Sequence, residues 1–573
     1  MPLHNEIRIL DLLPGNTEDP LECSIRTAAL GSDTPYETLS YVWGNQQCGR
    51  IVHIAGHDVE VTSNLYAALL RLRDPNTIRA LWVDQLCINQ WDDAEKAEQV
   101  NLMRLIYKHC SRCLIWLGEV EDGFTVQDAE AAFAFIRLFA VCHNQPAPDV
   151  PPNLQTPRVI EGASQALKAM MLNENPWWSR IWTVQEAVLP QKATFRWGPL
   201  SIPLEALERA AHNMCYNKIP VDLQPTLYQL YGNPDNFTAP VRGLDIARQG
   251  ELPLDLLQRW RYREATDPRD KIYALMGLFP TMPFPNVQSC SYELSTVTLY
   301  ARVTLDLIQL EGRLRPLIGR SGEPHVTEGL PTWAIDMVRC EDPKKRAWSW
   351  HKQSHRYKKF SADGNESFQW ESLNEGSVLS LKGVFVDKIV EIGQTISEDN
   401  WGDISDDEII DVILAWEEML ARFVERHGTH VWSLSRENAF WRTMLGDLIM
   451  TEFPVRRVED ADHGGFIDFC KNRSHNEVYL SVRDMVVNQA FFITESGYIG
   501  IGPPTVRARD QVWVIFGSQV PLILRQRVEL SNGRVEEVGR NDYDFVGDAF
   551  VYGFMDGEAV SHSEGKQEVI ILH

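Results

Sequence analysis

The sequence predicts an α/β protein with a doubly wound parallel sheet at the N-terminus, a helical middle region and a β-rich C-terminal domain. In the first third of the chain, short apolar segments typical of buried strands alternate with segments of helical spacing. Between about Ser201 and Leu310, helical spacing dominates. From Phe491 onward, short strand-like segments are separated by glycine and proline turns, which is typical of an antiparallel meander or a small barrel.

The N-terminal sheet is predicted from strands and helices that alternate along the chain. The expected strands are Tyr36–Val42, Ala80–Asp84, Cys113–Leu117 and Ala193–Trp197. One expected helix is Ser63–Leu72, capped by Ser63 or Asn64, and another begins at Asp92 with Glu95 in a capping-box arrangement. Such repetition favours parallel pairing. The proline-rich stretch 146–157 interrupts the pattern and is predicted to be an insertion.

The rest of the chain changes character twice. The expected helices of the middle region are Pro203–Asn213, Leu254–Arg263, Asp270–Leu278 and Tyr292–Leu310. Val378–Ile392 alternates between apolar and polar residues as a strand does, and Ser405 with Glu408 forms a capping box at the start of a helix. We therefore expect domains at 1–200, 201–340 and 341–573, the last with a helical insertion at about 405–490.

Composition and charge restrict the class of partner. The 573 residues include 79 Asp and Glu against 55 Lys and Arg, for a formal net charge of −24, which repels nucleic acid at long range. A basic stretch with interleaved aromatic residues at 344–359 is the exception, and a solvated loop or a docking surface for the chain's own acidic domain is favoured over a nucleic-acid site. The sequence shows no membrane span and no signal peptide, and its 10 cysteines are scattered, so we expect a cytoplasmic protein.

Several common catalytic motifs are absent from the sequence, including the phosphate loop GxxxxGK[ST], the GxSxG elbow and HExxH. Cys110 and Cys113 have the spacing of metal ligands, but no second pair accompanies them, so core cysteines are the better interpretation. Cys87 has no histidine nearby in sequence, which argues against a cysteine hydrolase. We expect no metal and no resident cofactor.

Three polar and tryptophan-rich clusters stand out among apolar residues: Leu39–Gly44, Leu81–Gln90 and Trp177–Glu186. The first two lie where predicted parallel strands end, and ligands of doubly wound sheets bind at such ends. Together with Asp92, Glu95, Gln99 and the CLIWLG strand, the clusters closely resemble the heterokaryon-incompatibility (HET) domain of filamentous fungi. The resemblance covers about Tyr36 to Glu186 and continues less sharply through the DPRDKIYALMG segment that begins at Asp267.

The resemblance implies a role in fungal nonself recognition, in which growth arrest or programmed cell death follows the fusion of genetically different hyphae. It also implies an incompatibility partner protein. HET domains look like remote relatives of TIR domains, and the spacing of Trp182 and Glu186 is similar to that of the TIR helix that carries the catalytic glutamate. The resemblance therefore implies a TIR-like fold, self-association, and NAD as a candidate substrate that is cleaved at its nicotinamide–ribose bond.

The candidate site residues follow from this chemistry. Nicotinamide leaves as a neutral base, so the reaction requires a carboxylate beside the ribose rather than a general acid, and Glu186 is the candidate. Trp43 and Trp182 are candidates for stacking on a base, and Arg180 for binding the pyrophosphate. Ser40 and Asp84 are candidates for contacts with ribose.

The same residues also have structural interpretations. Glu186 could pair with Arg180, the tryptophans could belong to the core, and Asn89 and Gln90 could satisfy the backbone of their loop. If these interpretations hold, the chain is a non-enzymatic signalling or adaptor module that acts through protein–protein interaction and oligomerisation. Both functions stay open from the sequence.

Overall fold

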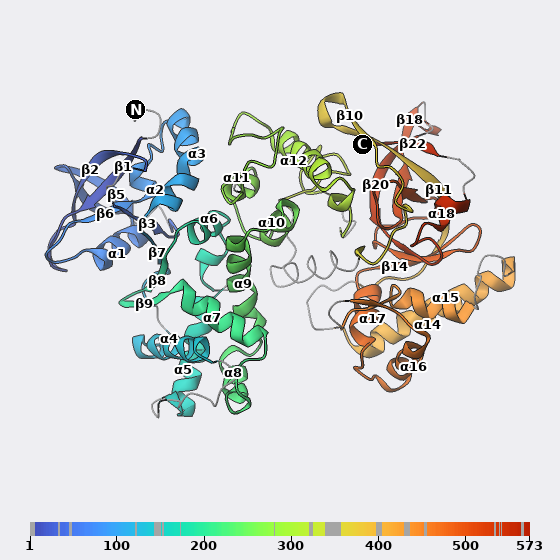
Figure 1. Cartoon of the computed structure of the whole chain (residues 1–573), viewed down its shortest axis with the longest axis horizontal. Coiled ribbons are helices and arrows are strands. Elements are labelled where there is room, and N and C mark those ends of the chain that lie inside the picture. Colours follow the sequence, from blue (N-terminus) through green and yellow to red (C-terminus); the bar gives the residue numbers. More distant parts are fainter. Residues whose placement is uncertain are drawn as a thin grey trace. The chain divides into compact units, whose positions relative to one another are not determined.

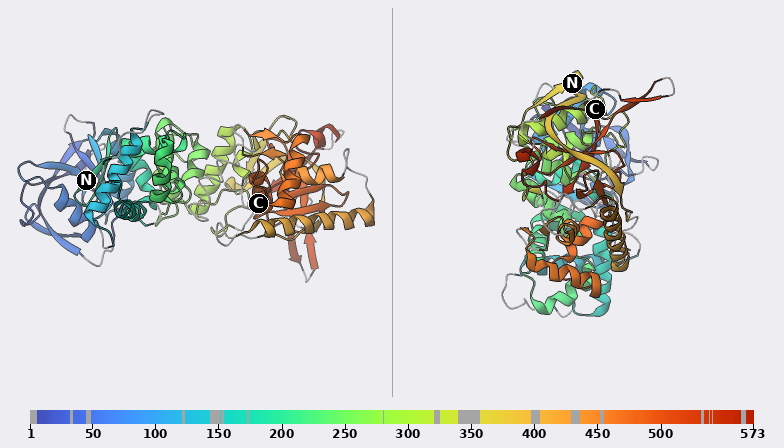
Figure 2. Two further views of the ribbon diagram at one scale, coloured as in Figure 1. Left: turned by 90° about the horizontal axis from the view of Figure 1, so that it is seen from below. Right: turned by 90° about the vertical axis from the view of Figure 1, so that its right-hand side faces the viewer.

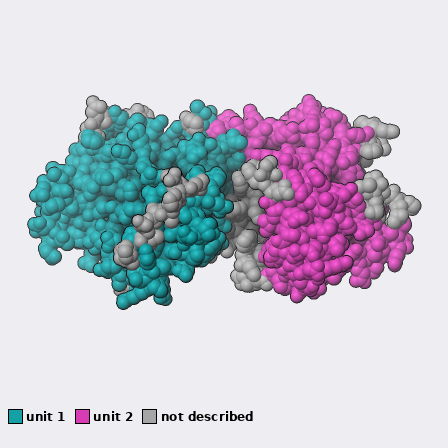
Figure 3. All heavy atoms as spheres, turned by 60° about the horizontal axis from the view of Figure 1, so that its bottom comes forward, with its two compact units in different colours: residues 1–282, 288–293 teal, residues 283–287, 294–573 magenta. Residues whose placement is uncertain are grey.

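The computed structural model describes residues 6–31, 35–44, 49–120, 123–142, 151, 154–171, 174–279, 281–319, 325–338, 357–396, 404–428, 436–451, 455–531, 534–537, 539, 541–562 and 567–573. The chain forms two compact units, which are coloured separately in Figure 3. Unit 1 comprises Met1–Met282 and Gln288–Glu293, and unit 2 comprises Pro283–Val287 and Leu294–His573. The chain thus enters unit 2 at Pro283, returns to unit 1 for six residues and then continues in unit 2.

Unit 1 is built on a nine-stranded sheet with the order β5-β4-β2-β1-β6-β3-β7-β8-β9. Its strands are β1 (Glu6–Leu12), β2 (Glu22–Ala29), β3 (Glu37–Ser40), β4 (Gly49–Ile54), β5 (His57–Thr62), β6 (Arg79–Trp82), β7 (Arg112–Trp116), β8 (Ala193–Trp197) and β9 (Leu200–Pro203). The neighbouring strands β6, β3, β7 and β8 are parallel and are the four strands that the sequence predicts. Antiparallel strands extend the sheet on both sides, so it is mixed as a whole.

Helices surround this sheet and continue through the middle of the chain (Figure 1). The helices of unit 1 are α1 (Ser63–Leu72), α2 (Asp84–Cys87), α3 (Asp93–His109), α4 (Val126–Ala140), α5 (Pro157–Met170), α6 (Trp182–Val188), α7 (Leu204–Cys215), α8 (Gln224–Tyr231), α9 (Asp235–Gln249), α10 (Pro253–Trp260) and α11 (Asp270–Met276). α6 packs against β3 and β7 and also contacts α3, α9 and α11. Its residues Thr183–Val188 are all buried, so α6 is a core helix. The α/β class and the helical middle region are confirmed.

Two helix starts differ in detail from the sequence prediction. α1 has the predicted bounds, but Thr62 caps it, because its hydroxyl accepts from the backbone N–H of Leu65 at 3.3 Å. The longer side chain of Asn64 reaches the strand ends instead, donating to Val42 O at 2.7 Å and accepting from Trp116 Nε1 at 2.8 Å. The predicted cap at Ser63 or Asn64 is therefore wrong.

The start of α3 is confirmed in one residue and corrected in another. Asp92 caps the helix and accepts from the backbone N–H groups of Ala94 and Glu95. Glu95 does not complete a capping box; its buried carboxylate accepts from the N–H of Asn89 at 3.0 Å and forms an ion pair with Arg8 of β1. Arg8 thus binds the carboxylate that would otherwise complete a capping box.

Unit 2 contains the predicted β-rich domain. Its main sheet runs β16-β17-β20-β22-β11-β14-β15-β21, and β11 also pairs with β16 and β10. The strands are β10 (Trp370–Leu373), β11 (Val378–Ile392), β14 (Ala490–Thr494), β15 (Ile499–Gly502), β16 (Gln511–Ile515), β17 (Leu522–Gln526), β20 (Asp542–Asp548), β21 (Phe550–Val551) and β22 (Glu568–Leu572). The pairings of β11, β16, β17, β20 and β22 close into a ring, which confirms the predicted small barrel.

Helices and a separate hairpin complete unit 2. The helices are α12 (Thr296–Glu311), α14 (Asp406–His427), α15 (Arg436–Met444), α16 (His463–Asn472), α17 (Tyr479–Val486) and α18 (Glu558–His562). Ser405 and Glu408 form the predicted capping box of α14. β12 (Leu448–Ile449) pairs with β13 (Arg456–Arg457). β18 (Val528–Ser531) pairs with β19 (Arg534–Glu537), and Figure 2 shows this hairpin extending beyond the main sheet.

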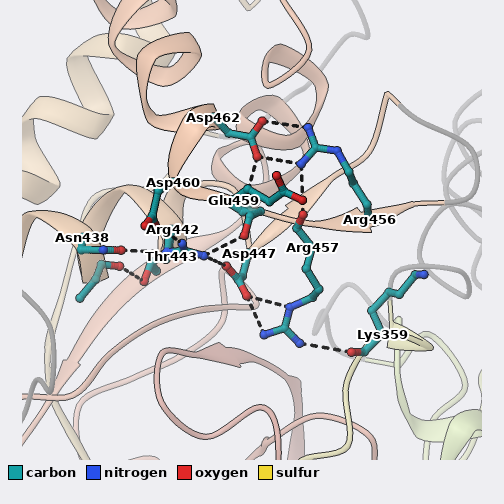
Figure 4. Close-up of polar contacts among 12 residues, drawn as sticks. Lys359, Asn438, Arg442, Thr443, Asp447, Arg456, Arg457, Glu459, Asp460 and Asp462 are labelled. Atoms are coloured by element: carbon teal, nitrogen blue, oxygen red, sulfur yellow. Dashed lines mark hydrogen bonds and ion pairs between the residues drawn. The ribbon is translucent and has the colours of Figure 1, made fainter.

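Arginines and carboxylates form a network of ion pairs around β12 and β13 of unit 2 (Figure 4). The buried carboxylate of Asp447 accepts from Arg442 Nη1 and from Arg457 Nε, both at 2.8 Å. Arg442 also pairs with Asp460, and Arg457 also pairs with Asp556, which lies after β21. Asp447 is therefore shared between two arginines.

Two predicted segments lie largely outside the described residues: most of the insertion at 146–157 and most of the basic stretch at 344–359. The division of the chain at residues 200 and 340 stays a prediction. No helix among the described residues is long and apolar enough to cross a membrane.

Candidate functional site

Three elements bring the sequence-predicted site residues of unit 1 together. Ser40 is the last residue of β3, and Asp84 begins α2 just after β6. Because β3 and β6 are adjacent and parallel, their carboxyl ends lie at one edge of the sheet. Helix α6 packs against β3 and carries Glu186 to the same place. The site therefore lies where the fold class predicts ligand binding.

Glu186 and Ser40 form the buried part of the site. The Ser40 hydroxyl donates to Glu186 Oε2 at 2.5 Å, and the indole Nε1 of Trp177 donates to Ser40 Oγ at 2.8 Å. Burial raises the pKa of Glu186 from 4.5 to about 7, although Arg180, the Ser40 hydrogen bond and Arg263 lower it. Glu186 is 5 % exposed. A carboxyl group with this pKa changes its charge close to neutral pH.

Asp84 forms the second, partly buried carboxylate of the site. Trp43 Nε1 donates to Asp84 Oδ2 at 2.8 Å, and the backbone N–H of Gln85 donates to Oδ1 at 2.7 Å. Burial raises the pKa of Asp84, while the charge of Arg180 and these hydrogen bonds oppose the rise. The Tyr41 hydroxyl donates to Gln85 Oε1 at 3.0 Å. Trp43 and Asp84 thus form one hydrogen-bonded pair at the strand ends.

Arg180 acts electrostatically on both carboxyl groups of the site. Its positive charge lowers the pKa of both Asp84 and Glu186. Its Nη1 donates to the backbone oxygen of Tyr41 at 2.6 Å, which ties the segment before α6 to the end of β3. A partly exposed arginine beside two acidic groups has the chemistry to bind an anionic ligand.

Trp182 lies apart from this cluster. Its indole Nε1 donates to Asp270 Oδ2 of α11 at 3.1 Å, and the Tyr292 hydroxyl donates to Asp270 Oδ1 at 2.7 Å. Burial raises the pKa of Asp270. The structure therefore brings Ser40, Trp43, Asp84, Arg180 and Glu186 together and directs Trp182 toward α11.

The structure also adds groups that the sequence analysis did not select. Trp177 is both a core residue and a hydrogen-bond donor to Ser40, while Trp178 stacks on Phe195 in the core. Arg263 acts on Glu186 from the end of α10. Trp177 could have been selected from the sequence, because it is an aromatic residue within a polar cluster. No local sequence pattern indicates Arg263.

The remaining polar residues of the clusters have structural contacts. Gln90 Nε2 donates to the backbone oxygen of Asp84, and Asn89 Oδ1 accepts from the N–H of Trp91. Cys87 is buried, and its burial raises the pKa of the thiol to about 12, so it is not a nucleophile at neutral pH. Within the described ranges, no group of three or more His, Cys, Asp and Glu side chains could hold a metal ion.

Comparison with known proteins finds matches to two families. Residues 36–186, which contain every residue of the site cluster, match the family model "Heterokaryon incompatibility protein (HET)", and residues 466–571 match the "Het-6 beta-barrel domain". Two segments of the chain are thus similar to domains of heterokaryon-incompatibility proteins.

A curated relative extends the likeness over nearly the whole chain. This relative is "Heterokaryon incompatibility protein 6, OR allele" of Neurospora crassa, which is 24 % identical over 97 % of this chain and 95 % of its own length. No solved structure matches the chain.

Proposed function

We propose that this chain is an effector of fungal nonself recognition that triggers cell death, and that its HET domain hydrolyses NAD to nicotinamide and ADP-ribose. The first part is supported by the HET match and by the nearly full-length likeness to the Neurospora protein. The second part is supported by one observation above all: a buried carboxyl group, Glu186, hydrogen-bonds to the end of β3 beside a second carboxylate and an arginine.

The proposed reaction breaks the bond between nicotinamide and ribose. Nicotinamide takes the bonding electron pair and leaves as a neutral base, and water adds to the ribose carbon and releases a proton. Glu186, in its ionised form, stabilises the positive charge that develops on the ribose. Because the pKa of Glu186 is about 7, the ionised fraction and the rate rise together as the pH increases through neutrality.

The other residues of the cluster have supporting roles. Arg180 binds the pyrophosphate, Trp43 stacks on a base, and Asp84 and Ser40 contact ribose hydroxyls. Trp182 has no role in this proposal, because its indole N–H is directed to Asp270. We further propose that the active form is a homo-oligomer and that an incompatibility partner controls it in the cytoplasm.

A second function is favoured by the burial of Glu186. At 5 % exposure, its carboxylate accepts from Ser40 as a structural residue of a core helix would. In this alternative, the chain is a non-enzymatic adaptor, and the exposed parts of the clusters contact another protein.

One experiment separates the two functions. Full-length protein is incubated with NAD, and nicotinamide release is followed by chromatography beside Glu186→Gln and the exposed control Glu205→Gln. We expect release by the wild type and by Glu205→Gln, and at least a hundredfold loss in Glu186→Gln, as for removal of a transition-state electrostatic contact. Absence of release by the wild type, or equal release by Glu186→Gln, overturns the NAD proposal and leaves the adaptor.

A further inference from the structure

Arg263 is a fully buried cation in the core of unit 1. It follows the end of α10 and is 0 % exposed. Four aromatic rings surround its guanidinium carbon, with centroids at 4.8 Å (Trp260), 5.7 Å (Trp178), 5.8 Å (Trp177) and 6.0 Å (Tyr262). Aromatic faces attract a cation, but they do not neutralise its charge. The position therefore holds a positive charge in an apolar environment, which is rare without a compensating group.

Two hydrogen bonds of Arg263 go to the turn that begins α6. Its Nη1 donates to Thr183 Oγ1 at 2.7 Å and to the backbone oxygen of Arg180 at 3.2 Å. The next residue, Glu264, adds two backbone hydrogen bonds, one from its N–H to Ser179 O and one from Ile181 N–H to its oxygen. This segment thus fixes the start of the helix on which Glu186 lies one turn further on.

The charge of Arg263 acts on Glu186. Among the described residues, no carboxylate forms a direct ion pair with Arg263, and Glu186 is the carboxyl group whose charge favours the ionised guanidinium. In return, Arg263 favours the ionised form of Glu186. Each of these buried charges is therefore stabilised by the other.

We propose that Arg263 is a positioning residue for Glu186: its buried hydrogen bonds to Thr183 and to the backbone oxygen of Arg180 fix the first turn of α6, on which Glu186 lies, and its charge acts on that carboxyl group. This inference deepens the proposed function and rests on it. It explains why a cation, rather than another apolar side chain, occupies a core position among tryptophan rings.

Several other titratable groups face Glu186 from the elements around it. They are Arg180 before α6, Asp84 on α2, Tyr41 after β3, Tyr107 on α3 and Cys113 on β7. Burial raises the pKa values of Tyr41, Tyr107 and Cys113 well above their ordinary values, so these three groups are uncharged at neutral pH. The charges that act on Glu186 there are those of Arg180, Arg263 and, with the opposite effect, Asp84.

The test measures the ionisation of Glu186 directly in the full-length chain. Infrared spectra are recorded across the pH range, and the Glu186 carboxyl signal is isolated by subtracting the spectrum of Glu186→Gln. Arg263→Gln removes the charge and keeps a donor for Thr183, whereas Arg263→Lys keeps the charge. The matched control is Arg259→Met, which removes another mostly buried arginine of the same segment, one that pairs with Glu251.

We expect the midpoint of Glu186 to move to higher pH in Arg263→Gln, because the charge of Arg263 lowers the pKa of Glu186. Arg263→Lys and Arg259→Met should keep the midpoint close to the wild-type value. An unchanged midpoint in Arg263→Gln overturns the proposal. If Arg263→Gln does not fold, Arg263→Met is the second charge-free variant, and the ionisation midpoint of Glu186 in that variant tests the proposal in the same way.

The activity assay gives a separate readout. In Arg263→Gln, we expect nicotinamide release to fall at pH 7 and to recover at higher pH with little change in KM, because the lost property is ionisation of Glu186. A loss that is equal at every pH indicates a purely structural role and overturns the proposal. The infrared midpoint does not depend on turnover, so a wild type without NAD cleavage refutes the proposed function and not the coupling of Arg263 with Glu186.

Discussion

Ser40 and Glu186 lie 146 residues apart in sequence, and the hydroxyl of the first donates to the carboxylate of the second at 2.5 Å. Ser40 ends a parallel strand, and Glu186 lies on a helix that is buried almost throughout. A single hydrogen bond thus joins the first and the third of the motif clusters in the segment that matches the HET family model.

The first prediction concerns this hydrogen bond. Ser40→Ala removes a donor that lowers the pKa of Glu186, so the ionisation midpoint of Glu186 should move to higher pH. The unfolding free energy should fall by about 1.5–3 kcal/mol at a pH where Glu186 is charged. Ser164→Ala is the control, because Ser164 Oγ donates to the backbone oxygen of Leu230 away from the site. An unchanged Glu186 midpoint in Ser40→Ala contradicts the prediction.

The second prediction is a pH dependence of stability. The pKa of Glu186 is about 7 in the folded protein against an ordinary value of 4.5, so the folded state binds more protons between these values. The contribution of this group to stability is therefore complete below about pH 4.5 and falls as the pH rises to about 7, by at most about 3 kcal/mol.

Glu186→Gln should lose this pH dependence and gain stability relative to the wild type between about pH 5 and pH 8. Denaturant unfolding monitored by tryptophan fluorescence at several pH values measures the difference, with Glu205→Gln as the exposed control. If the difference between wild type and Glu186→Gln is constant with pH, Glu186 does not have the raised pKa.

The third prediction separates Trp182 from the site. Trp182→Phe removes the indole donor to Asp270 and should cost about 1 kcal/mol of unfolding free energy. It should leave the ionisation midpoint of Glu186 and nicotinamide release as in the wild type. A double-mutant cycle with Asp270→Asn gives the coupling between α6 and α11. A shifted ionisation midpoint of Glu186 in Trp182→Phe would contradict this prediction and show that Trp182 acts on the site.

The fourth prediction concerns unit 2. Asp447→Asn leaves Arg442 and Arg457 without their shared carboxylate and should destabilise unit 2 by roughly 3 kcal/mol. Asparagine tolerates the positive φ of 54° at this position, so the loss reflects charge rather than backbone strain. The exposed pair Glu418–Arg422 is the comparison, and Glu418→Gln should cost less than about 1 kcal/mol. Equal losses in calorimetry contradict the assignment of Asp447 as a shared anchor.

Sequence patterns predict the parts of the fold that local chemistry determines. The bounds of α1, β8 and β11 agree residue for residue with the apolar periodicity of their segments. β2 is different, because its residues Glu22–Ala29 are mostly exposed or half-buried and lack a clear apolar alternation. Its pairing with β1 is a tertiary effect, and no local pattern predicts it.

The candidate site likewise contains residues that the sequence predicts and residues that it does not. Ser40 and Asp84 are predictable because they follow apolar strands, where doubly wound sheets bind ligands. Arg263 and Asp270 are not, since each reaches α6 from more than 75 residues away in sequence. A buried arginine has the same sequence signature as one in solvent, and only packing distinguishes them.

Because the chain returns briefly to unit 1, the coding sequence of that unit extends to Glu293. Within unit 1, Cys290 N–H donates to Asn101 Oδ1 at 2.9 Å, and the Tyr292 hydroxyl donates to Asp270. The segment that matches the HET family model ends at residue 186, but unit 1 continues to Glu293. A premature stop or frameshift between these two positions therefore leaves the segment that matches the HET model whole and still removes part of the unit in which that segment folds.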